Sequence, residues 1–398
     1  MIDRFRLHRP RRFPLPMSSG VSIFPGQSAT LIARPQTNKF YPERLLIKEA
    51  TLWQIDAIRV GDRPDALVQG LPGKMFGPTA PGRFPGCGEI EIPPGGDLIV
   101  ELTYTGPREA GIPFEACVFG SDDQTPPLIT STTYQRSEKK IATARSGSAI
   151  LAGQSTKLCT DPMKCDTWPC RLVIKEASDW IINDVCVGEV SIFAESGDVP
   201  GSMFSEGTES VICLGRIAAG ETFSVVATYI GHSTGSEFMY ELYGTFNESE
   251  ANALPIAAIL PMSSGVNILP ERSAQITGRC QRPDAHRRGI GLSQGFLAER
   301  IVIEGATDWS LNDIKIGRTS QLAQSGDMPG LAFNPGVLGG AVSFDVARAG
   351  IDVVIVTTHV GPREVGAAFV CGILGSVIEL AKAEPSPPRG RILSVKDL

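Results

Sequence analysis

The chain has 398 residues, a net charge of −6, and a composition that is 42% hydrophobic and 20% charged. This length predicts about two to four domains, and the composition is that of a globular protein and not a disordered one. The acidic balance excludes a body built to bind nucleic acid, and no apolar run approaches the roughly 20 residues that span a bilayer. Segment 1–12 is basic, but no apolar stretch follows it, so it predicts no signal peptide and we expect synthesis in the cytoplasm.

A threefold internal repeat organises the chain. Three tryptophans, Trp53, Trp180 and Trp309, are spaced 127 and 129 residues apart. An arginine lies nine residues before each tryptophan and a glycine eight residues after it. These anchors are Arg44, Arg171 and Arg300, with Gly61, Gly188 and Gly317. A Pro-Gly pair three residues ahead of a phenylalanine and a long apolar run follow each tryptophan, so the chain is three tandem copies of one domain.

The repeat offsets divide the chain into segments. We expect a basic N-terminal arm over 1–12, repeat 1 over 13–121, a linker over 122–140, repeat 2 over 141–245, a linker over 246–256, repeat 3 over 257–376 and a C-terminal tail over 377–398. Repeats 1 and 3 share the sequences PMSSGV and Gly-Pro-Arg-Glu, which repeat 2 lacks. Repeat 2 instead holds five of the nine cysteines.

Apolar and polar side chains alternate within each copy, which is the period of a β-strand. In repeat 1, Leu98, Val100, Leu102 and Tyr104 fall on one face of such a segment. About seven or eight short segments of this kind fit into each copy, and helical spacing is scarce. The sequence therefore predicts an all-β protein of three tandem antiparallel β-sandwich (jelly-roll-like) domains. It does not separate Greek-key from jelly-roll connectivity.

The alternation slips by one residue at Asn183-Asp184 and at Asn312-Asp313, just after the tryptophans of repeats 2 and 3. Such a slip turns the following side chains out of the core unless the backbone absorbs it. We therefore predict a β-bulge or tight turn at each pair, which Asn and Asp tolerate. A calcium site at these pairs and Asp56 is the alternative, but the roughly six to eight oxygen ligands it needs are not supplied by any local motif.

Histidine, the usual acid–base residue, gives no catalytic pattern. The four histidines are His8, His232, His286 and His359. They occupy unlike positions, and His359 aligns with the inward residues Tyr104 and Tyr229, which favours a role in the core. No nucleophile elbow, phosphate-binding loop, dinucleotide fingerprint or zinc-protease motif occurs. We therefore predict that the protein is not an enzyme and holds no cofactor.

Three cysteines gather in repeat 2, at Cys159, Cys165 and Cys170. Their spacing is not that of a zinc site, and no histidine lies near. We expect a local disulfide or simple packing, and no bound metal. The odd total of nine cysteines fits a reducing compartment.

The predicted interface residues lie in the arm and in two matched loops. The arm carries Arg4, Arg6, Arg9, Arg11 and Arg12 against one acidic residue. Such an arm can neutralise phosphates in a salt-sensitive, non-specific contact. It can also dock on a neighbouring subunit through Phe5, Leu7 and Phe13, which we favour over nucleic acid.

The matched loops carry Arg108-Glu109 and Arg363-Glu364, whose arginines are expected to face carboxylates of a neighbour. The repeated arginines Arg44, Arg171 and Arg300 are expected either to pair with a carboxylate inside each copy or to be solvated.

Tandem sandwiches with extended arms resemble, in architecture, the jelly-roll coat and capsid-associated structural proteins of viruses and phages. The resemblance covers the three repeats and the arms. It implies a self-assembling structural protein found in a virion or another assembled particle, with copies of itself and other structural subunits as partners. It also implies that the three fused copies form a pseudo-threefold unit in place of three subunits.

Two other classes remain as alternatives. A carbohydrate-binding, adhesin-like protein would need aromatic side chains exposed on loops, whereas the repeated tryptophans sit in apolar strands. An enzyme would need one copy to carry polar residues that the others lack, and no such set is found.

Overall fold

The structure is a computed structural model that describes residues 12–36, 38–61, 68–77, 84, 90–107, 109, 111–123, 139–206, 214–246, 256–279, 294–324, 326–334, 342, 344–362 and 364–379. Its regular elements are antiparallel β-strands and short 3-10 turns. The predicted all-β fold class is confirmed.

Three successive sets of strands make up the protein, here named copies 1, 2 and 3. Copy 1 comprises β1 (Arg12–Ile23), β2 (Ser28–Ala33), β3 (Tyr41–Ile47), η1 (Ala50–Leu52), β4 (Trp53–Val60), β5 (Val68–Pro72), η2 (Gly73–Phe76), β6 (Leu98–Tyr104) and β7 (Ile112–Ser121). Copy 2 comprises β8 (Lys139–Ile150), β9 (Ser155–Cys159), β10 (Trp168–Ile174), η3 (Ala177–Asp179), β11 (Trp180–Val187), β12 (Val190–Ser191), β13 (Val199–Pro200), η4 (Gly201–Phe204), β14 (Phe223–Tyr229) and β15 (Ser236–Thr245). Copy 3 comprises β16 (Ile256–Ile268), β17 (Ser273–Arg279), β18 (Gln294–Ile303), η5 (Ala306–Asp308), β19 (Trp309–Ile316), β20 (Thr319–Ser320), β21 (Met328–Pro329), η6 (Gly330–Phe333), β22 (Ala347–Arg348), β23 (Asp352–His359) and β24 (Ala367–Glu379).

Each copy is a sandwich of two sheets. In copy 3 the sheets have the orders β16-β24-β18-β22 and β17-β23-β19-β20, with β21 also paired to β19. If β20 and β21 count as one position, the eight positions pair in the orders 1-8-3-6 and 2-7-4-5. This is the jelly-roll connectivity, in which the first strand lies beside the last. Copies 1 and 2 repeat the pattern with the orders β1-β7-β3 and β2-β6-β4-β5, and β10-β15-β8 and β12-β11-β14-β9.

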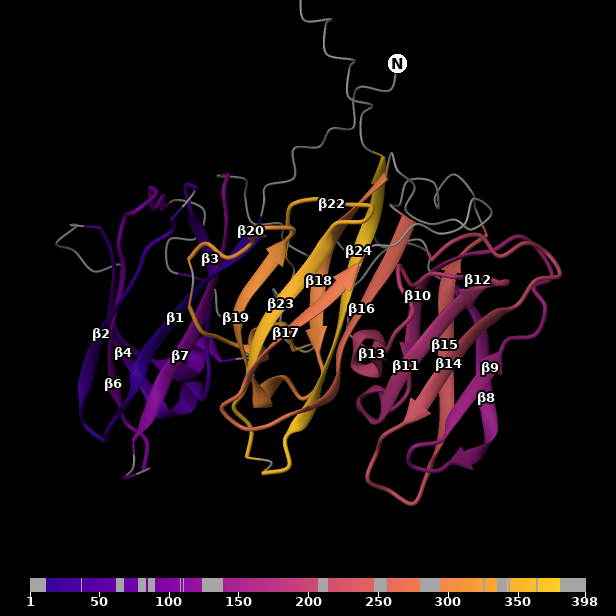
Figure 1. Cartoon of the computed structure of the whole chain (residues 1–398), viewed down its shortest axis with the longest axis horizontal. Coiled ribbons are helices and arrows are strands. Elements are labelled where there is room, and N and C mark those ends of the chain that lie inside the picture. The colour runs from indigo at the N-terminus through magenta and orange to yellow at the C-terminus, as the bar shows by residue number, and fades with distance from the viewer. Residues whose placement is uncertain are drawn as a thin grey trace, which may run out of the picture.

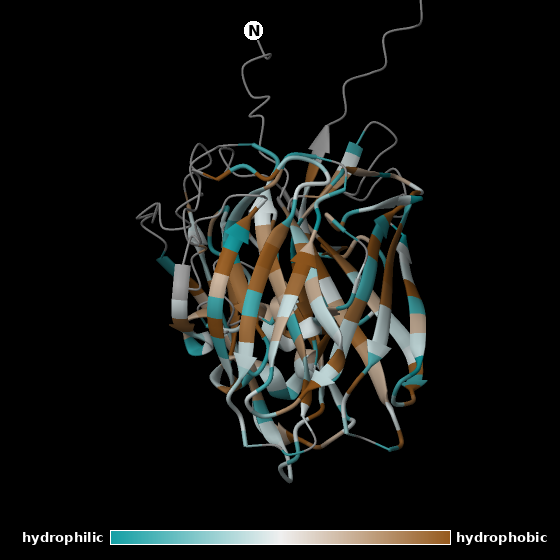
Figure 2. Ribbon diagram, turned by 90° about the vertical axis from the view of Figure 1, so that its left-hand side faces the viewer, coloured by the Kyte–Doolittle hydropathy of each residue, from teal (hydrophilic) through white to brown (hydrophobic). Residues whose placement is uncertain are grey.

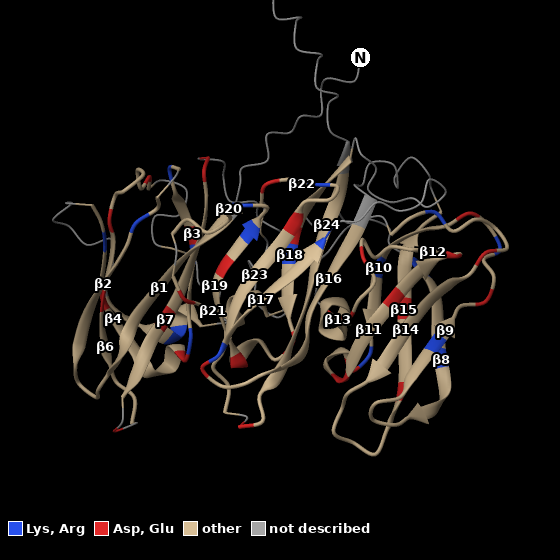
Figure 3. Ribbon diagram, viewed as in Figure 1, with Lys and Arg blue, Asp and Glu red and all other residues tan. Residues whose placement is uncertain are grey.

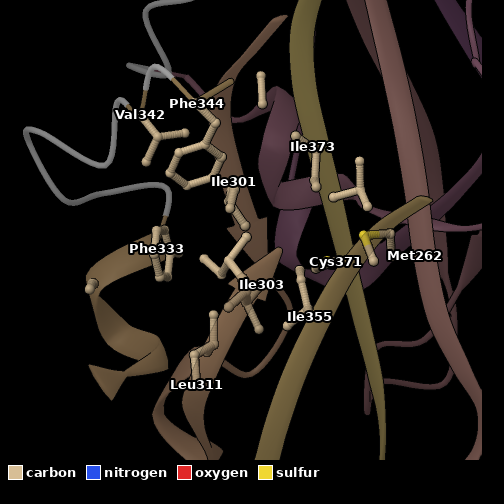
Figure 4. Packing of buried hydrophobic residues seen from close by; sticks show 14 of the residues in the cluster. Met262, Ile301, Ile303, Leu311, Phe333, Val342, Phe344, Ile355, Cys371 and Ile373 are labelled. Carbon is tan, nitrogen blue, oxygen red and sulfur yellow. The ribbon is translucent and has the colours of Figure 1, made fainter. Parts of the chain in front are cut away.

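The period of two places the cores as predicted. Leu98, Val100, Leu102 and Tyr104 on β6 are fully buried between the two sheets of copy 1. Figure 4 shows the corresponding interior of copy 3, where side chains from both sheets and from η6 meet. Polar residues take the alternate positions of β6, so this strand buries one face and leaves the other partly exposed.

The predicted β-bulges are present. The pairing of β11 with β14 shifts register between Ile182 and Asp184, and that of β19 with β23 shifts between Leu311 and Asp313. Copy 1 has the same shift between Ile55 and Ala57. The extra residue returns the apolar side chains beyond it to the core.

The copies do not follow one another in space as they do in the chain. Figure 1 shows copy 3 in the centre, with copy 1 (indigo) and copy 2 (magenta) at the two ends of a row. Seen from the copy 1 end, brown and teal segments alternate along the strands (Figure 2). The charged residues lie mainly in turns and at strand ends (Figure 3).

Candidate assembly interface

Each repeated tryptophan lies at the centre of its sandwich. Trp53, Trp180 and Trp309 are 2%, 0% and 2% exposed. Each pairs across the sheet with an aromatic residue, Tyr104, Tyr229 or His359, at ring distances of 5.0, 4.9 and 4.9 Å. His359 is fully buried and neither of its ring nitrogens has a hydrogen-bond partner, which is the environment of a core residue.

The repeated glycines close the turn after the tryptophan strand. Gly61, Gly188 and Gly317 have φ near +60° (58°, 61° and 60°), a conformation that favours glycine. Their amides donate to the backbone carbonyls of Asp97, Thr222 and Asp352, respectively. These glycines therefore have a structural reason to recur that involves no ligand.

The three repeated arginines lie on the outer face of one sheet in each copy. Arg44 is only 6% exposed, and this burial lowers its pKa to about 10. Arg171 and Arg300 are half-buried, and the Arg171 guanidinium stacks on the ring of Tyr243 at 4.4 Å. The expectation of a solvated side chain is therefore wrong for Arg44, which lies beside the contact between copies 1 and 3.

Copy 1 meets copy 3 through the outer face of the sheet β1-β7-β3. The segment after β20 lies along β1, where the Ala323 amide donates to the Pro14 carbonyl at 2.9 Å. The Gln324 side chain accepts from the Arg34 amide at 2.5 Å. Below them, the Cys117 thiol lies 3.4 Å from the sulfur of Met328. Leu46 and Phe119 of copy 1 join the buried core cluster of copy 3.

Copy 3 meets copy 2 through the outer face of the sheet β16-β24-β18. The segment after β12 lies along β16, where the Ala194 amide donates to the Ile259 carbonyl at 2.6 Å. The Glu195 side chain accepts from the Arg279 amide at 2.7 Å. Below them, Val199 and Met203 contact Gly372 so closely that a Cβ there would clash with both. Three side chains of copy 3 join the core cluster of copy 2: Ile259, Val302 and Leu374.

These two contacts are one interface used twice. Ala194 and Ala323 both lie fourteen residues after the tryptophan of their copy, and Glu195 and Gln324 both lie one residue further. On the receiving side, Gly197 faces Pro261 and Gly326 faces Pro16, the prolines of the two PMSSGV sequences. An edge of one copy thus binds a different surface, the sheet face, of the next, which makes the contact heterologous.

A half-buried carboxyl, that of Glu304, lies beside the contact between copies 3 and 2. Burial first, and the charge of Asp179 in copy 2 second, raise the pKa of Glu304 in copy 3 to about 7. Lys48, which holds the same place in copy 1, is instead paired with Glu115 at 2.8 Å. Sequence reasoning missed Glu304, because the corresponding residues of the other copies are lysines.

Of the predicted interface residues, the structure describes Arg12, Glu109 and Glu364. Arg4, Arg6, Arg9 and Arg11 fall outside the described residues, as do Arg108 and Arg363. Glu109 and Glu364 are exposed, in loops after the matching strands β6 and β23. Arg12 pairs with Ser121 at one end of β1, whereas Ile23 pairs with Ile112, just after the Glu109 loop, at the other. Arg12 and Glu109 therefore lie at opposite ends of copy 1.

The cysteines and the Asp/Asn pairs have structural roles. Cys159, Cys165 and Cys170 form no disulfide with one another, which leaves packing of the two expected alternatives; Cys170 is buried and the other two are exposed. Asn183 and Asn312 each donate to an aspartate, Asp198 or Asp327, at 2.7 and 2.5 Å. Within the described ranges, no three His, Cys, Asp or Glu side chains gather into a metal-binding group.

A shallow groove of about 480 Å³ lies at the junction of copies 1 and 3. Its lining comprises Ile32, Arg34, Gln36 and Gln324. Arg34 is held by Asp97 at 2.5 Å, so its charge is already compensated. No helix among the described residues is long and apolar enough to cross a membrane.

The fold thus belongs to the class of tandem jelly-roll proteins. Among solved structures, the major capsid protein P2 of bacteriophage PM2 is similar to this chain, with a TM-score of 0.29 and 10% identity over 60% of this chain and 98% of that chain. No family model matches the sequence, and no curated protein matches it.

Proposed function

We propose that the chain is a self-assembling structural protein, a coat or capsid-associated component of a virion or phage particle. In this role one chain supplies three jelly-roll units in place of three separate subunits. Jelly rolls occur in viral shells, but also in lectins and cupins, so the fold by itself does not choose among these.

The observation that carries the proposal is the repeated contact between copies. Its central side chains, Leu46, Met328, Val199, Ile259 and Val302, are all 0% exposed. Interfaces of this apolar kind are typical of permanent association. These contacts hold the three sandwiches in a row (Figure 1).

The alternative of a carbohydrate-binding protein has less support. Sugar sites use exposed aromatic rings, but the three repeated tryptophans are buried. The groove at the junction of copies 1 and 3 has no aromatic residue in its lining.

Sedimentation velocity over a hundredfold range of protein concentration, with negative-stain microscopy of the same samples, tests the proposal. We expect species larger than one chain that grow with concentration and form regular particles, sheets or tubes. A chain that remains a monomer throughout that range, at low and high salt, would refute it.

A further inference from the structure

A heterologous contact that is used twice in a row of three units leaves one unused surface at each end. The order in space is copy 1, copy 3, copy 2. Copy 1 offers its sheet face to copy 3, so its own edge at β5 and η2 has no neighbour among the described residues of the other copies. Copy 2 offers its edge to copy 3, so the outer face of its sheet β10-β15-β8 has none either.

The free edge of copy 1 exposes apolar side chains that are buried in the other copies. Met75 is 47% exposed, whereas Met203 and Ala332, at the same position of η4 and η6, are 1% and 0% exposed. Leu71 is half-buried, whereas Val199 and Met328 in the same register are 0% exposed. This edge therefore presents the residues of the contact without its partner.

The outer face of the sheet β10-β15-β8 in copy 2 resembles the sheet faces of copies 1 and 3 that bind the edge of a neighbouring copy. It differs from those two faces at its centre. Val173 holds the place of Leu46 and Val302 but is only 5% exposed, so the residues around it form the surface that a partner would meet. Glu241 holds the place of Cys117 and Gly372, because all three residues pair with that position across the sheet. The Glu241 carboxylate accepts from Lys140 at 2.7 Å and from the Tyr243 hydroxyl at 2.5 Å.

The polar groups of Glu241, Lys140 and Tyr243 suit an interface between two chains better than an interface within one chain. The faces inside the row are covered when the chain folds, whereas a face that waits for another molecule must first stay soluble in water. Interfaces between separately folded partners are accordingly more polar than permanent ones.

From this arrangement we infer that chains join head to tail. The edge of copy 1 formed by Leu71, Pro72 and Met75 docks on the outer face of the sheet β10-β15-β8 of a second copy of this chain. The contact has the same sense as the two inside the row. This inference deepens the proposed self-assembly and rests on it, since it names the two surfaces that would link one chain to the next.

A mixed cysteine experiment tests the register of the joint. Met328 contacts Cys117 inside the chain, and the corresponding pair between chains is Leu71 with Glu241. Leu71→Cys chains are mixed with Glu241→Cys chains, oxidised mildly and separated on a non-reducing gel. We expect a disulfide-linked dimer in the mixture that exceeds the dimer of either variant alone at least tenfold; the single variants control for the native thiols. Equal dimer in all three samples would overturn the inference.

A second pair of variants does not depend on a disulfide. Met75→Asp places a charge on the proposed edge, and Val266→Asp places one on a residue that is 69% exposed away from both row ends. Sedimentation should show Met75→Asp raising the concentration needed for assembly at least tenfold, with Val266→Asp unchanged. Normal assembly by Met75→Asp, together with no mixed dimer, would overturn the head-to-tail joint and leave the proposed function standing. A wild-type chain that never assembles would refute both.

Discussion

At the level of single residues, the aromatic residue opposite each tryptophan differs between the copies. Copies 1 and 2 use tyrosine, whereas copy 3 buries His359 with both ring nitrogens lacking a hydrogen-bond partner. A buried polar group without a partner costs about 1–3 kcal/mol. Gly361 nevertheless holds the place of Gly106 and Gly231, whose lack of a Cβ leaves room for the tyrosine hydroxyl.

We therefore expect His359→Tyr to raise the free energy of unfolding by about 1 kcal/mol. The reverse exchange, Tyr229→His, should lower it by at least as much, because it also removes the bond between the Tyr229 hydroxyl and Ser233. Denaturant unfolding followed by tryptophan fluorescence measures both changes. A destabilising His359→Tyr would mean that copy 3 has a differently shaped centre.

Truncation of a repeated tryptophan should be costly in any copy. Trp180→Ala empties a site that is 0% exposed and is lined by Tyr229 and Phe238 at ring distances of 4.9 and 4.7 Å. Loss of a large buried aromatic side chain costs about 3–5 kcal/mol. Trp168→Ala, at a half-buried position of the same copy, is the matched control and should cost clearly less. Equal costs in thermal and denaturant unfolding would contradict a central role for Trp180.

At the level of elements, the repeated Pro-Gly pair shapes the turn beside each tryptophan. A Cβ on Gly73 would lie 2.5 Å from the carbonyl oxygen of Ala50 and 2.7 Å from that of Trp53. Only glycine allows η2 to pack this closely against η1, and the same holds for η4 and η6.

Gly73→Ala should therefore destabilise copy 1 by several kcal/mol, since backbone atoms on both sides must move. Gly77→Ala, four residues further along, is a matched control, because its Cβ would meet the nearest atoms at 3.4 and 3.5 Å, an ordinary contact. Thermal unfolding of the two variants measures the difference. A similar melting temperature for both would show that η2 can shift without cost.

Much of each sandwich could be predicted from the sequence, because the signals are local. The period of two located the buried faces, and the slip at Asn183-Asp184 located a bulge. The order of the copies could not be predicted in this way. It depends on the segments around Ala194 and Ala323, which carry the unlike sequences IFAE and QLAQ between two short strands. Their hydrogen bonds to the next copy use mainly backbone groups, which nearly every residue type can supply, so the sequence gives no signal for them.

At the level of the whole molecule, the contact between copies 3 and 2 should respond to pH through Glu304. Its pKa is raised from 4.5 to about 7, so the folded chain binds a proton there that the unfolded chain releases. The contribution to stability is fully present below about pH 4.5 and is lost as the pH rises through 7. The free energy of unfolding attributable to Glu304 should thus increase by at most about 3 kcal/mol as the pH falls from 8 to 4.5.

Glu304→Gln isolates this effect from other carboxyl groups, such as Asp97 and Asp352, whose lowered pKa values act in the opposite direction. The difference in stability between wild type and Glu304→Gln should change with pH between 4.5 and 7 and level off outside that window. A difference that stays constant with pH would show that Glu304 titrates normally.

The terminal segments supply the remaining prediction, because β1 begins at Arg12 and β24 ends at Glu379. The strands β1 and β24 pair within the described residues, so removal of segments 1–11 and 380–398 leaves every described strand intact. Folding stability should therefore be unchanged, while the mass of the assemblies measured by light scattering should fall at least twofold if the arms link chains.

Two further variants separate the two roles proposed for the N-terminal arm. Phe5→Ser with Leu7→Ser should weaken assembly if the arm docks on a neighbour, and replacement of Arg4, Arg6, Arg9 and Arg11 by Ser should weaken only nucleic acid binding if the arm contacts phosphates. Assemblies of unchanged mass after deletion of both segments would leave the row-end surfaces as the sole link between chains.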